Sequence, residues 1–223
     1  MTALSGALAE HPRLEQWVGF PAPGQVAIYT GKVEIGQGIL TAMLQLAAEE
    51  LDVAPSRIAI EAGDTDRTPN EGFTSGSQSM QFGGVALRQA CAEVRALFLA
   101  QAARKLGCPT TELAIVDGRI LRDGKPTADD YWTLAPAIDL AAKASGDASR
   151  KAKAHYSVVG QDEDRVDLPA KLFGAPAFIH DMTLDGMLHA RVVRQPCRSA
   201  TLAAVDEAAI RKAARAVSVT CSG

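Results

Sequence analysis

A glycine-flanked segment between a strand-like run and a helix-like run is the feature that most constrains this chain. Residues 31–38 read G-K-V-E-I-G-Q-G. Residues 25–34 have the apolar pattern of a strand, and residues 39–51 repeat apolar side chains at helical spacing. Such a turn presents backbone N–H groups beside the partial positive charge of a helix amino terminus. The junction therefore predicts a binding site for phosphate or another oxyanion.

Gln37 adds a side-chain amide at this junction that can both donate and accept hydrogen bonds. The segment is neither a dinucleotide-binding G-x-G-x-x-G fingerprint nor a P-loop, because the third glycine and the Gly-Lys-Ser/Thr ending are missing. A tight strand-to-helix turn with a solvated glutamine remains the alternative to an anion site.

A second polar segment stands ahead of another helical run. Residues 63–79 are rich in Gly, Ser, Thr, Asp and Asn and predict a long loop, which ends T-S-G-S-Q-S at 74–79. The hydroxyls of Ser77 and Ser79, with the backbone donors that open a helix over 80–106, can wrap an anion in the same way. A serine N-cap with solvent-facing neighbours is the alternative. Convergence of both segments on one pocket would favour the anion site.

The remaining pattern predicts short elements on both sides of a polar stretch. Asp117-Gly118 is a two-residue turn signal within a hairpin over 113–121. Residues 143–156 are polar and charged without an apolar period, which is typical of an interdomain linker. The other expected elements are strands at 57–61, 187–194, 201–205 and 217–220 and helices at 131–142 and 206–216.

Charge and cysteine content exclude several classes of protein. The 223 residues carry a net charge of −3 and no block of Lys or Arg, which argues against binding to nucleic acid or to an anionic membrane surface. The cysteines form no C-x-x-C pair and the histidines lack the spacing of a helical metal pair, so we assign no metal ligand. No catalytic residue is assigned either. Without a leader-like or membrane-spanning run, the pattern predicts a cytoplasmic protein with reduced thiols.

The combined motifs resemble a known enzyme family. Three stretches resemble the first molybdenum-cofactor lobe of the xanthine dehydrogenase/aldehyde oxidase family: G-K-V-E-I-G-Q-G-I-L-T-A-M-L-Q-L-A-A-E-E-L at 31–51, G-D-T-D-R-T-P-N-E-G-F-T-S-G-S-Q-S-M at 63–80 and G-G-V-A-L-R-Q-A at 83–90. Residues 165–196 resemble the small α/β hammerhead domain of the same subunits. The likeness is closest to the molybdopterin-binding subunits of bacterial two-subunit hydroxylases, of the isoquinoline 1-oxidoreductase and nicotinate dehydrogenase type.

The resemblance implies an α+β fold, in which the first cofactor-binding lobe is followed by part of a hammerhead domain. The expected divisions are an amino-terminal extended arm at 1–24, the lobe at 25–142, a linker at 143–156 and an incomplete hammerhead-like domain at 157–223. The rest of a longer subunit would then cover the helix at 39–51 and the strand at 217–220. Their exposure in this chain predicts self-association.

The resemblance also assigns roles to the two polar segments. One set matches a loop that contacts the pterin and the oxygens on molybdenum: Gly36, Gln37, Gly38 and Ile39. The other set matches the segment that holds the phosphate of the cofactor: Gly76, Ser77, Gln78 and Ser79. The implied cofactor is a molybdopterin-type molybdenum cofactor, with the cytosine dinucleotide as one form of it. In such enzymes an aldehyde or an N-heterocycle is hydroxylated with oxygen from water, and [2Fe-2S] clusters on a partner subunit export the electrons.

The sequence also departs from the family pattern. The catalytic glutamate of the family lies in a Gly-x-Gly-Glu-like stretch that does not occur here, and Phe82-Gly83-Gly84 has the wrong order for the family's Gly-Gly-x-Phe loop. The chain is therefore expected to be an amino-terminal portion of a large subunit, with the remaining lobe and an iron–sulfur subunit as partners. A scaffold or assembly protein that docks a partner subunit, and a phosphate-ligand binding module, remain the alternatives.

We expect the purified chain to be inactive by itself, because both the general base and the electron-exporting clusters are missing from its sequence. The measurement is dye reduction in the presence of aldehydes or N-heterocycles. Substrate-dependent reduction by this chain alone would contradict the interpretation as a portion of a larger subunit.

Overall fold

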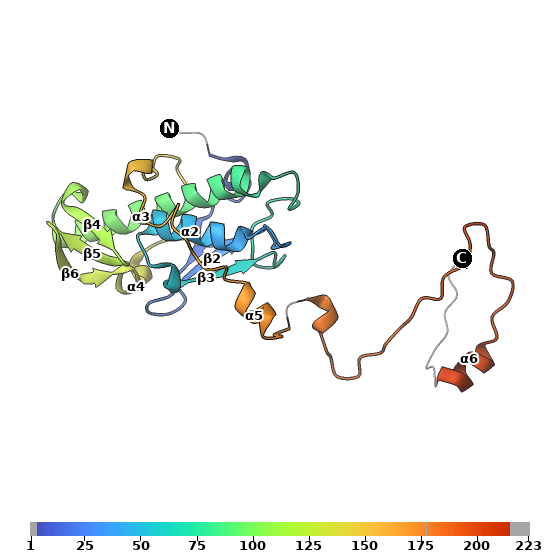
Figure 1. Cartoon of the computed structure of the whole chain (residues 1–223). Helices are drawn as coiled ribbons and strands as arrows, with labels where there is room; N and C mark the ends of the chain where they lie inside the picture. Colours follow the sequence, from blue (N-terminus) through green and yellow to red (C-terminus); the bar gives the residue numbers. More distant parts are fainter. Residues whose placement is uncertain (1–3, 177, 215–223) are drawn as a thin grey trace. The chain divides into compact units, whose positions relative to one another are not determined.

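The computed structural model describes residues 4–176 and 178–214 of the chain (Figure 1). By its internal contacts the chain divides into two units, Met1–Ala177 and Phe178–Gly223. The first unit contains both sheets and both long helices, and each unit is described by itself below.

The first sheet is built around a strand–helix–strand unit. Strand β2 (Val26–Thr30) pairs in parallel with β3 (Ile58–Ala62), and the short β1 (Val18–Gly19) pairs antiparallel with β2. Helix α2 (Ile39–Leu51) connects β2 to β3, as a parallel pair requires a crossover. The predicted helix at 39–51 is confirmed. The predicted strand at 25–34 is formed only in its first half, at 26–30, and the one predicted at 57–61 lies at 58–62.

Helix α2 packs on the longest helix, α3 (Val85–Leu106), and its apolar residues are already buried within this unit (Figure 1). The expectation that helix 39–51 needs a further lobe to cover it is therefore wrong. The predicted helix over 80–106 does not begin as an α-helix, because Ser79–Gly84 forms a π-helix, η3. Gly107, with φ of 64°, ends α3 in the left-handed conformation that favours glycine.

The second sheet is an antiparallel meander of β4 (Leu113–Val116), β5 (Arg119–Arg122) and β6 (Lys125–Asp130). The predicted hairpin is confirmed. Its turn residues Asp117 and Gly118 have φ of 49° and 79°, as a primed two-residue turn requires. The predicted helix at 131–142 is shorter than expected, because α4 (Tyr131–Leu134) gives way to a 3-10 turn that contains Pro136. Proline removes a backbone donor and clashes with the preceding turn.

Residues 4–24 differ from the expected extended arm, because they contribute to the core. Their elements are α1 (Gly6–Glu10), η1 (Leu14–Gln16) and β1. Leu8, Trp17 and Val18 are fully buried, and the Trp17 indole donates to the His11 carbonyl at 2.8 Å. Burial of these large apolar side chains holds the segment on the sheet. The remaining short elements of this unit are η2 (Pro55–Arg57), η4 (Thr110–Glu112), η5 (Ala135–Ala137), η6 (Lys153–His155) and α5 (Leu168–Leu172).

The second unit contains a 3-10 turn, η7 (Ile179–Asp181), and helix α6 (Glu207–Ala214). The predicted helix at 206–216 is thus confirmed over its described part, whereas the predicted strand at 217–220 lies outside the described residues. The strands expected at 187–194 and 201–205 are not formed. A strand is stable only when a neighbour satisfies its N–H and C=O groups, and residues 178–214 provide no paired strand.

None of the helices within the described ranges combines the length and the apolar character needed to cross a membrane.

Candidate functional site

The first candidate segment folds around the carboxylate of Glu34. Its Oε1 accepts the N–H groups of Gly36 and Gly38, each at 2.8 Å, and Oε2 accepts that of Leu40 at 3.4 Å. Burial raises the pKa of Glu34, but these hydrogen bonds outweigh it and hold the pKa below its ordinary value. Three of the N–H groups at this junction, those of Gly36, Gly38 and Leu40, are therefore already bound. An internal carboxylate occupies this helix terminus.

The turn requires glycine at two of its positions. Gly36 has φ of 105° and Gly38 has φ of 77°, both in the region that side chains other than glycine rarely adopt. The chain can thereby fold back so that these N–H groups face one carboxylate. These two glycines shape the turn.

Gln37 lies exposed at the tip of this turn, and its amide is bonded within the turn itself. Its Oε1 accepts the Ile35 N–H at 2.7 Å, and its Nε2 donates to the Val33 carbonyl at 3.1 Å. The second N–H of Nε2 and the second lone pair of Oε1 have no partner among the described residues, so a ligand can reach the exposed amide while the turn keeps these contacts. Ile39 differs, since its side chain is buried in the core and only its backbone faces the turn.

The second candidate segment has a different character. Gly76 and Ser77 both adopt left-handed backbone conformations, with φ of 61° and 58°. This conformation is uncommon for serine, and such residues cluster at functional sites. In the part of the chain that the structure describes, the hydroxyls of Ser77 and Ser79 make no hydrogen bond. Ser77 is exposed and available to a ligand, whereas Ser79 is buried, with 9% of its surface exposed. The π-helix that follows is a further feature common at functional sites.

Hydrogen bonds join the two segments side by side. The buried Lys32 ammonium donates to the carbonyls of Glu71 and Phe73, at 2.6 and 3.0 Å. The Val33 N–H donates to the Thr74 hydroxyl at 3.0 Å. These contacts bring residues 32–33 and 73–74 together; convergence of Gly36, Gln37 and Gly38 with Ser77 and Ser79 on a single pocket stays a prediction.

The Glu71 side chain adds a second link between the segments. Its Oε2 accepts from the Thr30 hydroxyl and from the Gly31 N–H, both at 2.6 Å. Its Oε1 is buried without a hydrogen-bond partner among the described residues, and it lies 2.4 Å from the place where a β-carbon on Gly83 would stand. Glycine at 83 therefore leaves room for this carboxylate between the loop and η3.

The residues predicted to form a linker, at 143–156, begin a longer segment that is hydrogen-bonded to α2 and α3. We call residues 145–166 the strap. Three buried glutamates accept its backbone N–H groups: Glu93 binds Gly146 at 2.7 Å, Glu50 binds Lys151 at 3.1 Å, and Glu49 binds Val158 at 2.7 Å. Buried carboxylates accept hydrogen bonds where they would otherwise be costly. The strap is thus a packed part of the first unit.

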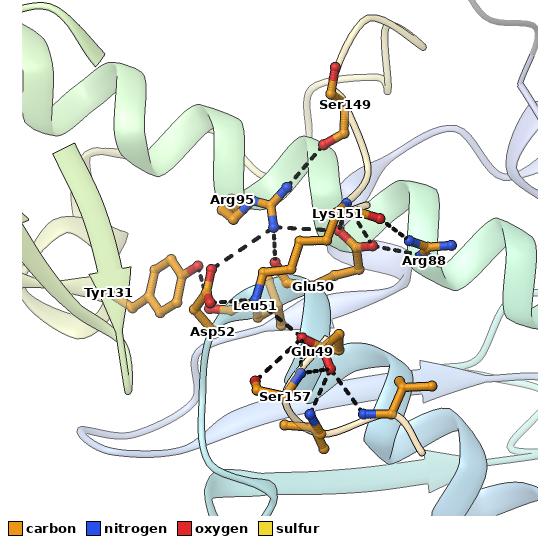
Figure 2. A network of polar contacts seen from close by, with 12 residues as sticks. Glu49, Glu50, Leu51, Asp52, Arg88, Arg95, Tyr131, Ser149, Lys151 and Ser157 are labelled. Atoms are coloured by element: carbon orange, nitrogen blue, oxygen red, sulfur yellow. Dashed lines mark hydrogen bonds and ion pairs between the residues drawn. The ribbon is translucent and has the colours of Figure 1, made fainter. Parts of the chain in front are cut away.

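Figure 2 shows the centre of this attachment. Three acids from the end of α2, Glu49, Glu50 and Asp52, face three bases from α3 and the strap, Arg88, Arg95 and Lys151, so that their formal charges balance. Burial raises the pKa of Glu49, but the N–H groups of residues 157–159 and the Lys151 ammonium bring it below its ordinary value. For Asp52 burial prevails, and its pKa is raised despite the same ammonium.

A polar stripe on α2 extends the attachment along the helix. Thr41, Gln45 and Glu49 are spaced by four residues, which places them on one helix face. The Thr41 hydroxyl accepts the Val166 N–H at 3.1 Å, and the Gln45 amide donates to the Gln161 carbonyl at 2.9 Å. None of the three was singled out from the sequence, although three polar residues at this spacing on an apolar helix are a readable signal.

The comparisons with known proteins identify the family of the chain. The family profile of the molybdopterin cofactor-binding domain matches residues 4–194, and the chain belongs to this family. It is 38% identical over 195 residues to a nicotinate dehydrogenase subunit of Pseudomonas putida, a match that covers 84% of this chain and 16% of that protein. It is 28% identical over 235 residues to the beta subunit of isoquinoline 1-oxidoreductase from Brevundimonas diminuta, covering 88% of this chain and 30% of that protein.

Solved structures of two molybdenum-enzyme relatives also match. Quinoline 2-oxidoreductase from Pseudomonas putida 86 matches with a TM-score of 0.47 and 25% identity, over 60% of this chain and 17% of that one. Reconstituted CO dehydrogenase from Oligotropha carboxidovorans matches with a TM-score of 0.46 and 28% identity, over 54% of this chain and 16% of that one.

The family profile and the two curated relatives confirm the predicted family and a molybdopterin cofactor as the ligand class. The separate helices and small sheets of the first unit confirm the α+β fold class. The chain spans less than a third of either curated relative, and it corresponds to a portion of a molybdenum hydroxylase subunit.

Proposed function

We propose that this chain forms one wall of the molybdopterin site in a molybdenum hydroxylase, with the segments 36–39 and 76–79 facing the cofactor. The observation that carries the proposal is the pair of contacts from Lys32 to Phe73 and from Val33 to Thr74, which ties the two segments to each other. Two loops so joined can contact one extended ligand, whereas two unrelated capped turns need no such connection.

The residues of the two segments fit different parts of the cofactor. The unbonded hydroxyls of Ser77 and Ser79, with the backbone at Gly76 and the exposed side chain of Gln78, suit the phosphate end, whereas the Gln78 N–H already donates to the Ser75 carbonyl at 3.2 Å. The N–H groups of Gly36, Gly38 and Leu40 are bound to Glu34, so we do not assign them to the phosphate. The exposed amide of Gln37 suits the pterin or the oxygens on molybdenum, since each of its two polar atoms makes only one bond within the turn.

The cofactor, when bound, supplies the two-electron oxidation in which water provides the oxygen for the substrate. The residues of this chain bind and orient it, and no catalytic residue is assigned to them. The names of the two curated relatives support an N-heterocycle as the substrate class, with an aldehyde as the alternative. Both names denote subunits, which supports an iron–sulfur subunit and the remaining cofactor lobe as partners. Cytoplasmic location and the cytosine dinucleotide form of the cofactor belong to the same proposal.

Self-association of the chain by itself also stays a prediction. Its support is now a set of exposed apolar side chains beside the two segments, not α2. Ile35 is 70% exposed, Phe73 is 91% exposed and Phe82 is 50% exposed. Apolar surface of this kind favours contact with another protein surface.

A titration of the isotope-labelled chain with inorganic pyrophosphate tests the phosphate assignment. We expect amide chemical shifts to change at residues 75–80 and to stay constant at Gly36, Gly38 and Leu40, since Glu34 already holds those three donors. Replacing both Ser77 and Ser79 with alanine should weaken binding by roughly tenfold or more, as two hydrogen bonds to a charged ligand are lost.

The matched control is Ser56→Ala, which alters an exposed serine in η2, on a different connection. It should leave pyrophosphate binding unchanged. Shifts confined to the start of α2, or equal binding by the double variant and the wild-type chain, would contradict the assignment of residues 76–79.

A further inference from the structure

The strap runs along α2 from its end to its beginning. Glu49 holds the backbone at residues 157–159, Gln45 holds it at Gln161, and Thr41 holds it at Val166. Each step of four residues toward the start of the helix therefore meets a later residue of the strap, so that the two run in opposite directions. The strap reaches the amino-terminal turn of α2, which is the first candidate segment.

Arg165 is the strap residue that contacts this turn. Its Nη1 donates to the Gly36 carbonyl at 3.1 Å, and its Nη2 lies 3.4 Å from Oε1 of Glu34. The same guanidinium binds both oxygens of Asp167, at 3.1 and 2.8 Å, so that its orientation is fixed by a bidentate pair. Asp167 in turn accepts from the Lys171 ammonium at 2.7 Å.

The Arg165 guanidinium thus links the turn to Asp167, a residue outside the turn. The Glu34 side chain is 6% exposed and that of Asp167 is 7% exposed, so two nearly buried carboxylates meet at this point. A shared cation between them removes their mutual repulsion. Glu34 can then remain ionised at the start of α2 and keep Gly36 and Gly38 in their left-handed conformations.

We propose that Arg165 is a positioning residue for the cofactor-facing turn, which it holds through Glu34 and the Gly36 carbonyl so that Gln37 is presented at a fixed place. This inference rests on the proposed function, which places the turn against the cofactor. The strap that delivers Arg165 is then a part of the cofactor wall, because its contacts along α2 place Arg165 at the amino-terminal turn of that helix.

Amide hydrogen exchange of the full chain tests the proposal. In Arg165→Gln, exchange at Gly36, Gly38 and Leu40 should become about tenfold faster, because an ionic contact to Glu34 and a hydrogen bond to Gly36 are lost. Exchange at residues 43–51 of α2 should stay as in the wild-type chain. Arg150→Gln removes the same charge from an exposed position on the strap and should leave the turn unchanged.

A second variant reaches the same turn without altering Arg165. Thr41→Val removes the hydroxyl that accepts the Val166 N–H and keeps the buried volume, so it should also accelerate exchange at 36–40. Unchanged exchange in Arg165→Gln would overturn the proposal, as would equal acceleration along all of α2, which indicates general destabilisation. Failure of the proposed function appears separately, as a wild-type chain that does not respond to pyrophosphate.

Discussion

Replacing Glu50 with alanine is expected to lower the free energy of unfolding by about 3–5 kcal/mol. The Glu50 side chain is fully buried and receives the Arg88 guanidinium at 2.6 Å, the Lys151 N–H at 3.1 Å and the Arg95 guanidinium at 3.5 Å. Its removal leaves two guanidinium groups facing a cavity without their partner. Such a loss is a large part of the total stability of a domain, which is about 5–15 kcal/mol.

Chemical denaturation followed by the fluorescence of the two tryptophans measures this change, since both Trp17 and Trp132 belong to the first unit. The control is Glu15→Ala, which removes one partner of an exposed ion pair with Arg13. An exposed pair contributes about 0–1 kcal/mol. If both variants lose a similar amount of stability, the buried network of Figure 2 does not hold the strap as described.

The local elements were predictable where one period or one turn signal decides the structure. Helix 39–51 has apolar residues on most of its surface, and Asp117-Gly118 permits only a tight turn between short strands. The strap offered no such signal, because its backbone bonds to glutamate side chains that stand far earlier in the chain. The strap has no apolar residues at regular spacing, and this indicated a linker. Its backbone N–H groups are instead bound by buried carboxylates, which hold the segment in place without such a pattern.

In the candidate site, too, some features were predicted from the sequence and others were not. Glycines at 36 and 38 were found from the sequence, and both have the positive φ that the turn requires. The role of Glu34 was missed, since the glycines and the helix start that follow are the same for an open anion site and for a helix terminus closed by a nearby glutamate. A carboxylate four residues ahead of the last glycine is the signal that separates the two cases, and it favours the closed one here.

Replacing Gly31 with alanine is expected to destabilise the first unit by roughly 3 kcal/mol, through overpacking and through loss of hydrogen bonds to a carboxylate. A β-carbon at this position would stand 2.2 Å from the Pro69 carbonyl oxygen and 3.0 Å from the Glu71 nitrogen. Both are backbone atoms, so no side-chain rotation can relieve the contact. The loop must move away from β2, and the Glu71 bonds to Thr30 and Gly31 must lengthen.

The matched control is Gly6→Ala in α1, where no atom lies within 4 Å of the added β-carbon. Alanine is the better helix former, so this variant should be neutral or more stable by about 0.5–1 kcal/mol. Both substitutions add one methyl group, but only Gly31→Ala separates the two candidate segments. The difference in stability between the two variants therefore measures how much the close contact of these segments contributes. Limited proteolysis of residues 63–79 should accordingly be faster in Gly31→Ala and unchanged in Gly6→Ala. Equal stability and equal cleavage in the two variants would mean that the Lys32 and Glu71 contacts do not hold the segments together.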